Sequence, residues 1–245
     1  MALYQVTIAY DGTEFKGFQR QKNGRTVQAE LESALRMLNW QERSLLSAGR
    51  TDSGVHAEGQ VVAFQLDWPH SVEQLKKAMN GLLPSDIGVQ AVSQADIGFH
   101  PRFAAMARDY RYQIYFSDSP NPLKERFHWR VWPKLEIEIL QRGCRLFEGK
   151  HDFRAFGKAP DEDSPTQRTI QSADWKIDPA GNEAFFRIRA KAFLYHMVRR
   201  IVYVLVRAGQ MRIDLDDIQA CIEKQSELPA GLAPAKGLIL EQIIY

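Results

Sequence analysis

The interpretation of this chain starts in its N-terminal half, with the stretch Ser47-Ala48-Gly49-Arg50-Thr51-Asp52-Ser53-Gly54-Val55-His56-Ala57. The stretch places a carboxylate, a guanidinium and two glycines in a short irregular segment between apolar runs. Glycine lets a backbone turn sharply or approach a ligand closely, so such a loop can hold Asp52 and Arg50 forward into a cleft. Aspartate in a turn is more often structural, because its carboxylate caps a nearby backbone N–H. A catalytic Asp52 would need to stay ionised in a dry pocket, which a neighbouring arginine favours.

Length and composition indicate a globular protein with a substantial core. The 245 residues, 44% of them hydrophobic, suit one large domain or two closely joined halves. The two cysteines, Cys144 and Cys221, lie in apolar helical patterns and are expected to be reduced core residues. The N-terminal run 3–8 has the pattern of a strand and not of a signal peptide, and no apolar run is long enough to span a bilayer. We therefore expect a soluble, cytoplasmic protein.

Charge is distributed unevenly along the chain, although the formal net charge is only +2. Seven basic residues and no acidic ones lie between Arg187 and Arg212. A second acid-free segment, residues 15–29, contains Lys16, Arg20, Lys22 and Arg25. Basic stripes on a nearly neutral protein suit a groove for a polyanion, but they are equally typical of solvated surfaces.

The first half of the chain predicts alternating strands and helices. Strands are expected at residues 4–10, 61–66 and 87–92. Thr26 can cap a helix with an apolar stripe at every third or fourth residue. Ser71 and Gln74 form the sequence signature of a capping box for a second helix, which Gly81 and Pro84 are expected to end.

The second half repeats this scheme. Strands are expected at 110–116, 169–177, 184–190 and 238–245, with the middle two forming a hairpin. Helices are expected from Pro133 to the residue before Gly149, from Phe193 to Ala208, and after Asp214. The segment 157–167 is expected to be a mobile loop. The pattern predicts an α+β fold of two ferredoxin-like halves, residues 1–105 and 106–245, sharing a mostly antiparallel central sheet flanked by helices.

Three further motifs could contribute to a site. The strand 107–112 alternates aromatic and charged residues, as in an ordinary sheet or in a platform for an unstacked base. Within the segment 192–202, Arg199 lies among apolar residues, and a mostly buried arginine needs an anionic partner. The segment 10–21 is a strand end followed by a glycine-containing basic loop, which could contact RNA or simply connect two elements.

These motifs together resemble those of the TruA family of tRNA pseudouridine synthases. The stretch around Asp52 is similar to the family signature G-R-T-D-A-G-V-H-A, with Ser53 in place of alanine. The other segments resemble Y-D-G-x-x-F-x-G-[WF]-Q-x-Q, A-R-x-Y-R-Y, G-x-H-D-F-x-x-F and F-L-x-H-M-V-R-N-I-V. Arg200 stands where the family often has asparagine, and Leu232 stands where threonine is usual. The resemblance extends from Tyr10 to Tyr245.

The resemblance implies a tRNA pseudouridine synthase that isomerises uridine at positions 38 to 40 of the anticodon stem-loop. It implies that Asp52 is the nucleophile and that Arg199 pairs with Asp52. Arg50 would fill the space left by a flipped nucleotide or hold that nucleotide. Tyr110 would stack on the target uracil. We expect Arg20, Arg108 and Arg111 to bind the RNA substrate. The resemblance also implies a homodimer and a reaction that needs neither a metal nor a cofactor.

Other functions remain open from the residues alone. A non-catalytic RNA-binding or RNA-remodelling module could use the same basic cleft, although a carboxylate in that cleft would repel phosphates. A carboxylate-dependent hydrolase built on Asp11 and Asp52 would need a second positioned carboxylate. The six histidines and two cysteines show no metal-ligand spacing, and the chain has no nucleotide-binding glycine motif. We therefore expect no bound metal, ATP or NAD.

Overall fold

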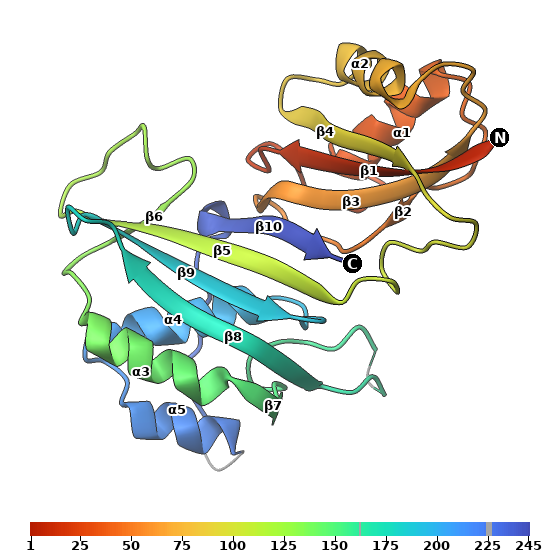
Figure 1. The fold of residues 1–245 in the computed structure, drawn as a ribbon. Coiled ribbons are helices and arrows are strands. Elements are labelled where there is room, and N and C mark those ends of the chain that lie inside the picture. Colours follow the sequence, from red (N-terminus) through yellow and green to blue (C-terminus); the bar gives the residue numbers. More distant parts are fainter. Residues whose placement is uncertain (162, 224–226) are drawn as a thin grey trace. The chain divides into compact units, whose positions relative to one another are not determined.

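The computed structural model describes residues 1–161, 163–223 and 227–245. The chain forms two compact units (Figure 1), the first made of Met1–Met106 with Ile239–Tyr245 and the second of Ala107–Leu238. The sequence predicted halves of 1–105 and 106–245, so the structure differs in assigning the last seven residues to the first unit. Sequence order cannot reveal this assignment, because it depends on which strand the final segment pairs with.

The first unit is a sheet with two helices. Its elements are β1 (Ala2–Tyr10), α1 (Val27–Met37), β2 (Leu46–Ser47), β3 (His56–Leu66), α2 (Val72–Leu82), β4 (Ile87–Gln94) and β10 (Leu238–Ile244). The strand order is β4-β1-β3-β10, with β2 also paired to β3. The β1–β3, β1–β4 and β2–β3 pairs are antiparallel, and β10 runs parallel to β3.

The helices of this unit cover one face of the sheet. Alternate side chains of β1, from Tyr4 to Tyr10, are buried, as expected for a strand with one face on the core. Leu31 and Leu35 of α1 and Leu75 and Met79 of α2 are fully buried with them. The helices lie next to each other beside β4 and β1 (Figure 1).

Both helix starts in this unit are confirmed. The Ala29 N–H donates to the Thr26 side chain at 3.4 Å, which caps α1. The Gln74 N–H donates to Ser71 Oγ at 3.3 Å and the Ser71 N–H donates to Gln74 Oε1 at 3.0 Å, which completes the capping box of α2. The predicted role of Gly81 as a stop is wrong, because Gly81 lies inside α2. The helix ends at Leu82 because the residue before a proline, here Leu83, disfavours helical geometry.

The position of Gly81 leads to a stability prediction. Gly81 is exposed, and a Cβ added there would meet no atom within 4 Å. Alanine loses less backbone entropy than glycine in a helix, so Gly81→Ala should raise the free energy of unfolding by roughly 0.5–1 kcal/mol. Denaturant titration of both proteins checks this. A variant that is no more stable than the parent would contradict the helical assignment of residue 81.

The second unit is a mostly antiparallel sheet with helices on one side. Its elements are β5 (Ala107–Phe116), β6 (Trp129–Val131), α3 (Ile137–Phe147), β7 (Gly149–Asp152), β8 (Gln167–Ile177), β9 (Glu183–Ala190), α4 (Met197–Gly209), α5 (Leu215–Ile222) and the 3₁₀ turn η1 (Ala235–Gly237). The strand order is β5-β9-β8-β7, and β6 runs parallel to β5. The helices α3, α4 and α5 lie together against this sheet (Figure 1).

The predicted β8–β9 hairpin is confirmed. Its turn is organised by Asp178, whose carboxylate accepts N–H donors from Ala180, Asn182 and Glu183 at 2.6–3.3 Å. These donors lower the pKa of Asp178, with the N–H of Glu183 making the largest contribution. An aspartate side chain that replaces a backbone acceptor in this way is a frequent way to close a turn.

Two predicted helix starts in this unit are wrong. α3 begins at Ile137 rather than at Pro133, because the preceding segment is held at the end of α4, where the Glu136 N–H donates to the Gly209 carbonyl at 3.1 Å. α4 begins at Met197 rather than at Phe193, because His196 has a left-handed backbone with φ of 65°. A residue in that conformation cannot continue a right-handed helix.

The α+β class, with mostly antiparallel strands flanked by helices, is confirmed. Cys144 and Cys221 are buried and not bonded to each other, as expected. In the predicted loop 157–167, Lys158 forms a bridge with Tyr195, while Glu162 lies outside the described residues. Over the described ranges, every helix is too short or too polar to cross a bilayer.

Candidate active site

The Asp52 loop connects β2 to β3 in the first unit. At its base the Ala48 N–H donates to the Val61 carbonyl at 2.8 Å, and the Gln60 side chain donates to the Gly49 carbonyl at 3.0 Å. At its tip the Val55 N–H donates to the Asp52 carbonyl at 3.2 Å, which closes a four-residue turn. Arg50 is exposed and Asp52 is half-buried. The loop is therefore fixed at both ends and presents a carboxylate and a guanidinium two residues apart.

The N-terminal motif packs directly against this loop. The Phe18 N–H donates to the Thr51 carbonyl at 3.1 Å. The Gly54 N–H and the Ser53 hydroxyl both donate to the Phe15 carbonyl, at 3.3 and 3.1 Å. Backbone groups on both sides of Asp52 are thus held by residues 15–18, so the two motifs form one structural unit.

Glycines allow the two segments to come this close. Gly17 has φ of 87°, and a Cβ added there would lie 2.7 Å from the Thr51 carbonyl oxygen. A Cβ on Gly12 would lie 2.0 Å from the Val55 carbonyl oxygen. Both distances are shorter than van der Waals contact allows, so neither position accepts a side chain without moving the Asp52 loop.

Polar side chains form further hydrogen bonds between the N-terminal motif and the Asp52 loop. The Gly12 N–H donates to Nδ1 of His56 at 2.9 Å, and Asp11 Oδ1 lies 3.1 Å from the same ring nitrogen. The Tyr10 and Thr51 hydroxyls form a hydrogen bond of 2.8 Å. His56 and Thr51 are buried, so these bonds are shielded from water. The hydrolase hypothesis needed Asp11 as a second catalytic carboxylate. In the structure Asp11 lies beside His56 and is part of these contacts.

Two arginines of the basic segment 15–29 form ion pairs. The Arg20 guanidinium lies 2.5 Å from the fully buried Glu32 carboxylate. Arg25 donates to both oxygens of Asp86 and to Glu30, and its guanidinium stacks over Phe15 at 4.3 Å from the ring centroid. The hydrogen bonds that Arg25 donates to Asp86 raise the pKa of Arg25 above its usual value. Arg20 and Arg25 therefore have a structural role in this unit.

The Arg20–Glu32 pair makes a testable contribution to stability. Arg20→Ala would leave the buried Glu32 carboxylate without this charged partner, while Gln28, Ser44 and Leu45 still donate to it. Because Arg20 is 42% exposed, the expected loss in the free energy of unfolding is modest, about 1–2 kcal/mol. Urea titration checks this loss. The double variant Arg20→Ala/Glu32→Gln should recover part of the stability, and no recovery would contradict the pairing argument.

In the second unit, Tyr110 lies on β5. Its half-buried ring packs edge-on against Phe193, with the centroids 5.2 Å apart at 89°. Arg108 and Arg111 lie on opposite faces of this strand, because side chains alternate along it. Arg108 is buried and donates to the Lys191 carbonyl. Arg111 lies directly opposite Arg187 in the register of β5 and β9. The structure therefore does not bring Arg108 and Arg111 together on one face.

Arg199 lies in the first turn of α4 and fastens the segment before η1. Its Nε donates to the Ala233 carbonyl at 2.8 Å, and the Ala233 N–H donates back to the Arg199 carbonyl at 3.2 Å. The Tyr112 hydroxyl donates to the next carbonyl, that of Pro234, at 2.7 Å. Burial raises the pKa of Tyr112 well above its usual value, and the charge of Arg199 partly opposes this shift.

Arg200, whose role the sequence left open, holds the preceding segment. Its guanidinium donates to the carbonyls of Leu228, Pro229 and Gly231 at 2.7–3.2 Å. Burial lowers its pKa below the usual value. The run of two arginines therefore ties α4 to residues 228–233 of the same unit. No sequence signal indicated this role, since backbone carbonyls accept from any donor that reaches them.

The predicted site residues are divided between the two units. Asp52, Arg50 and Arg20 belong to the first unit, and Tyr110, Arg108, Arg111 and Arg199 belong to the second. The pairing of Asp52 with Arg199 stays a prediction.

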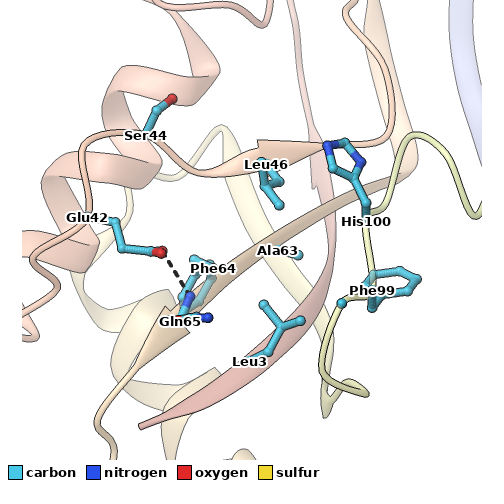
Figure 2. Close-up of a pocket in the computed structure, with 10 residues that line it drawn as sticks. Leu3, Glu42, Ser44, Leu46, Ala63, Phe64, Gln65, Phe99 and His100 are labelled. Atoms are coloured by element: carbon cyan, nitrogen blue, oxygen red, sulfur yellow. Dashed lines mark hydrogen bonds between the residues drawn. The ribbon is translucent and has the colours of Figure 1, made fainter.

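A shallow hollow of about 300 Å³ lies elsewhere on the first unit (Figure 2). Leu3, Leu46 and Ala63 give it an apolar floor, and Phe99 and His100 flank it. The Glu42 carboxylate points toward it and accepts the Gln65 N–H at 2.9 Å. None of the predicted site residues lines this hollow.

Within residues 1–161, 163–223 and 227–245, no three histidine, cysteine, aspartate or glutamate side chains are grouped as metal ligands.

Comparison with known proteins decides the family. The family model for tRNA pseudouridine synthase matches residues 6–104 and 144–245. The chain belongs to the tRNA pseudouridine synthase family. A relative named tRNA pseudouridine synthase A, from Pseudothermotoga lettingae, is 40% identical over 246 residues that cover both chains completely. The Bacillus subtilis protein of the same name is 38% identical over 98% of each chain.

The matched segments contain part of the predicted site. They include Asp52, Arg50, Arg20 and Arg199, whereas Tyr110, Arg108 and Arg111 lie between the two matched segments. Among solved structures, a "Crystal Structure of a Cbf5-Nop10-Gar1 Complex" aligns with 83% of this chain and 44% of that chain, at 14% identity and a TM-score of 0.37. The membership in the tRNA pseudouridine synthase family rests on the sequence matches alone.

Proposed function

We propose that this protein is an enzyme that converts uridine to pseudouridine in tRNA, at positions 38 to 40 of the anticodon stem-loop, with Asp52 as the nucleophile. The observation that carries the proposal is the Asp52 loop. Its backbone is fixed at Ala48, Thr51 and Gly54, and its tip holds a half-buried carboxylate two residues from an exposed guanidinium. Full-length similarity to proteins named tRNA pseudouridine synthase A supports tRNA as the substrate.

The proposed reaction begins with extrusion of the target uridine from its stack, since the reacting atoms are inaccessible within a stem. Arg50 is exposed at the loop tip and would occupy the vacated space or hold the flipped nucleotide. Tyr110 would hold the uracil ring by stacking. A ring held in this way can turn without diffusing away.

Asp52 then attacks the nucleotide, at the sugar or at the base ring, and the bond from the sugar to N1 of uracil breaks. The freed uracil turns and is rejoined through C5, which loses its hydrogen as a proton while N1 gains one. Product and substrate are therefore isomers, and no electrons enter or leave. Arg199 would stabilise the ionised form of Asp52 in this account, as an adjacent guanidinium does for a carboxylate.

The resemblance to the family also supports a homodimer acting on tRNA in the cytoplasm. Sedimentation of the purified protein should then give the mass of two chains. A monomer at all concentrations would contradict the dimer without affecting the chemistry.

The function is tested with unmodified tRNA transcripts. The protein should introduce pseudouridine within positions 38 to 40, detected by site-specific chemical labelling, and a chelator in the reaction should not reduce the yield. Tight binding without product would instead support an RNA-binding module. Product outside the anticodon stem-loop would contradict the proposed target.

A further inference from the structure

Tyr195 is an exposed aromatic residue between β9 and α4. It is 55% exposed. The ring stacks on that of His196, with centroids 3.7 Å apart and an interplanar angle of 26°. One face of the Tyr195 ring thus contacts the His196 ring, and the rest of the side chain is largely exposed to solvent.

Backbone hydrogen bonds fix the main chain at Tyr195. Tyr195 and Lys158 form an antiparallel bridge, in which each N–H donates to the other's carbonyl, at 3.0 and 3.1 Å. Gly157 allows this approach, because a Cβ there would lie 2.7 Å from Leu194 Cβ and 2.8 Å from the Tyr195 carbonyl oxygen. A ring that stacks on His196 and stands on a fixed main chain loses little conformational entropy when it binds a ligand.

Lys158 is the residue directly opposite Tyr195 in this bridge. Residues directly opposite each other in an antiparallel pair place their side chains on the same face. The exposed Lys158 side chain therefore leaves the backbone on the same face as the Tyr195 ring. Tyr195 also falls within the stretch 187–212, which has seven basic residues and no acidic ones. The positive charge of Lys158 and of the stretch 187–212 would attract both acidic protein surfaces and phosphates. The exposed ring favours a ligand with a flat π-face.

We propose that Tyr195 and Lys158 bind one unpaired nucleotide of the tRNA substrate, with the base stacked on the Tyr195 ring and a phosphate next to the Lys158 ammonium. The inference rests on the proposed function for the identity of the RNA. An exposed aromatic ring and a neighbouring cation are the two components with which proteins bind single-stranded nucleic acid regardless of sequence. This residue pair would add affinity and position the RNA, and it takes no part in the bond changes.

The experiment compares Tyr195→Ala, Tyr195→Phe and Tyr195→Leu for equilibrium binding of unmodified tRNA and for steady-state turnover. Tyr195→Ala and Tyr195→Leu should raise Kd and KM roughly fivefold to fiftyfold, with kcat within about twofold of wild type. Tyr195→Phe keeps the ring and should stay within about twofold. Lys158→Gln should reduce the slope of log Kd against log salt by about one. Trp132→Ala, at a ring that is also 55% exposed in the same unit, is the matched control and should leave Kd unchanged.

The outcomes separate this site from the proposed function. Unchanged Kd in Tyr195→Ala, an equal loss in Trp132→Ala, or an equal loss in Tyr195→Phe would each overturn the stacking site. If wild type makes no pseudouridine but Tyr195→Ala still weakens tRNA binding, the nucleotide site stands and the proposed function fails. If wild type makes pseudouridine and Tyr195→Ala is indistinguishable from it, the function stands and the site fails.

Discussion

Asp52→Asn should abolish pseudouridine formation, lowering the rate by at least about a thousandfold, because an amide cannot act as the nucleophile. The substitution keeps the size of the side chain and leaves the hydrogen bond from the Val55 N–H to the Asp52 carbonyl in place. Folding and tRNA binding should therefore be retained. The measurement is the single-turnover rate of product formation on tRNA, alongside thermal unfolding and Kd.

The conservative control is Ser53→Ala, which restores the residue usual in the family and removes only the 3.1 Å hydrogen bond to the Phe15 carbonyl. It should retain most of the activity. A rate for Asp52→Asn within tenfold of wild type would contradict the nucleophile assignment. Loss of folding in Asp52→Asn would point to a structural role for the carboxylate instead.

Gly17→Ala should have the second large effect, on stability and activity together. The position has φ of 87°, which costs an alanine about 1–2 kcal/mol. In addition, the new Cβ would lie 2.7 Å from the Thr51 carbonyl oxygen, which must move and carry the residue before Asp52 with it. We expect a loss of about 3 kcal/mol or more in the free energy of unfolding, and loss of turnover in the fraction that stays folded. Denaturant titration and turnover at low temperature measure the two effects.

Gly98→Ala separates backbone strain from the clash. Gly98 has a similar φ of 93°, but a Cβ there would meet no atom within 4 Å. This variant should lose only the strain, about 1–2 kcal/mol, and should keep full turnover. Equal effects in the two variants would show that the close approach of residues 11–18 to the Asp52 loop does not matter for the site.

Local features of the fold could be predicted from the sequence. Thr26, Ser71 and Gln74 cap their helices as expected, and the Asp178 turn joins two antiparallel strands as expected. Such features depend on contacts between residues close in the chain, so a single sequence contains the information. The errors at the starts of α3 and α4 arose because tertiary contacts and the left-handed His196 overrode the apolar periodicity.

The candidate site was predicted less completely. Motif resemblance identified Asp52 and its loop, but it did not show that residues 11–18 hold this loop through backbone hydrogen bonds. The basic stripe suggested free cations, whereas Arg20 and Arg25 lie in ion pairs with Glu32 and Asp86. The pairing of β10 with β3 could not be predicted either, because it joins residues as far apart in the sequence as His56 and Ile239. Each of these contacts is long-range, and one sequence without structure does not specify such partners.

The central claim is that the Asp52 carboxylate drives an isomerisation that replaces the bond at uracil N1 with a bond at C5. Release of tritium from tRNA labelled at uridine C5 tests it most directly, because C5 loses its hydrogen only when the new carbon–carbon bond forms. Wild type should release tritium from the labelled uridines that it modifies, and Asp52→Asn should release none above background. Tritium release by Asp52→Asn, or tight tRNA binding by wild type without any release, would contradict the account.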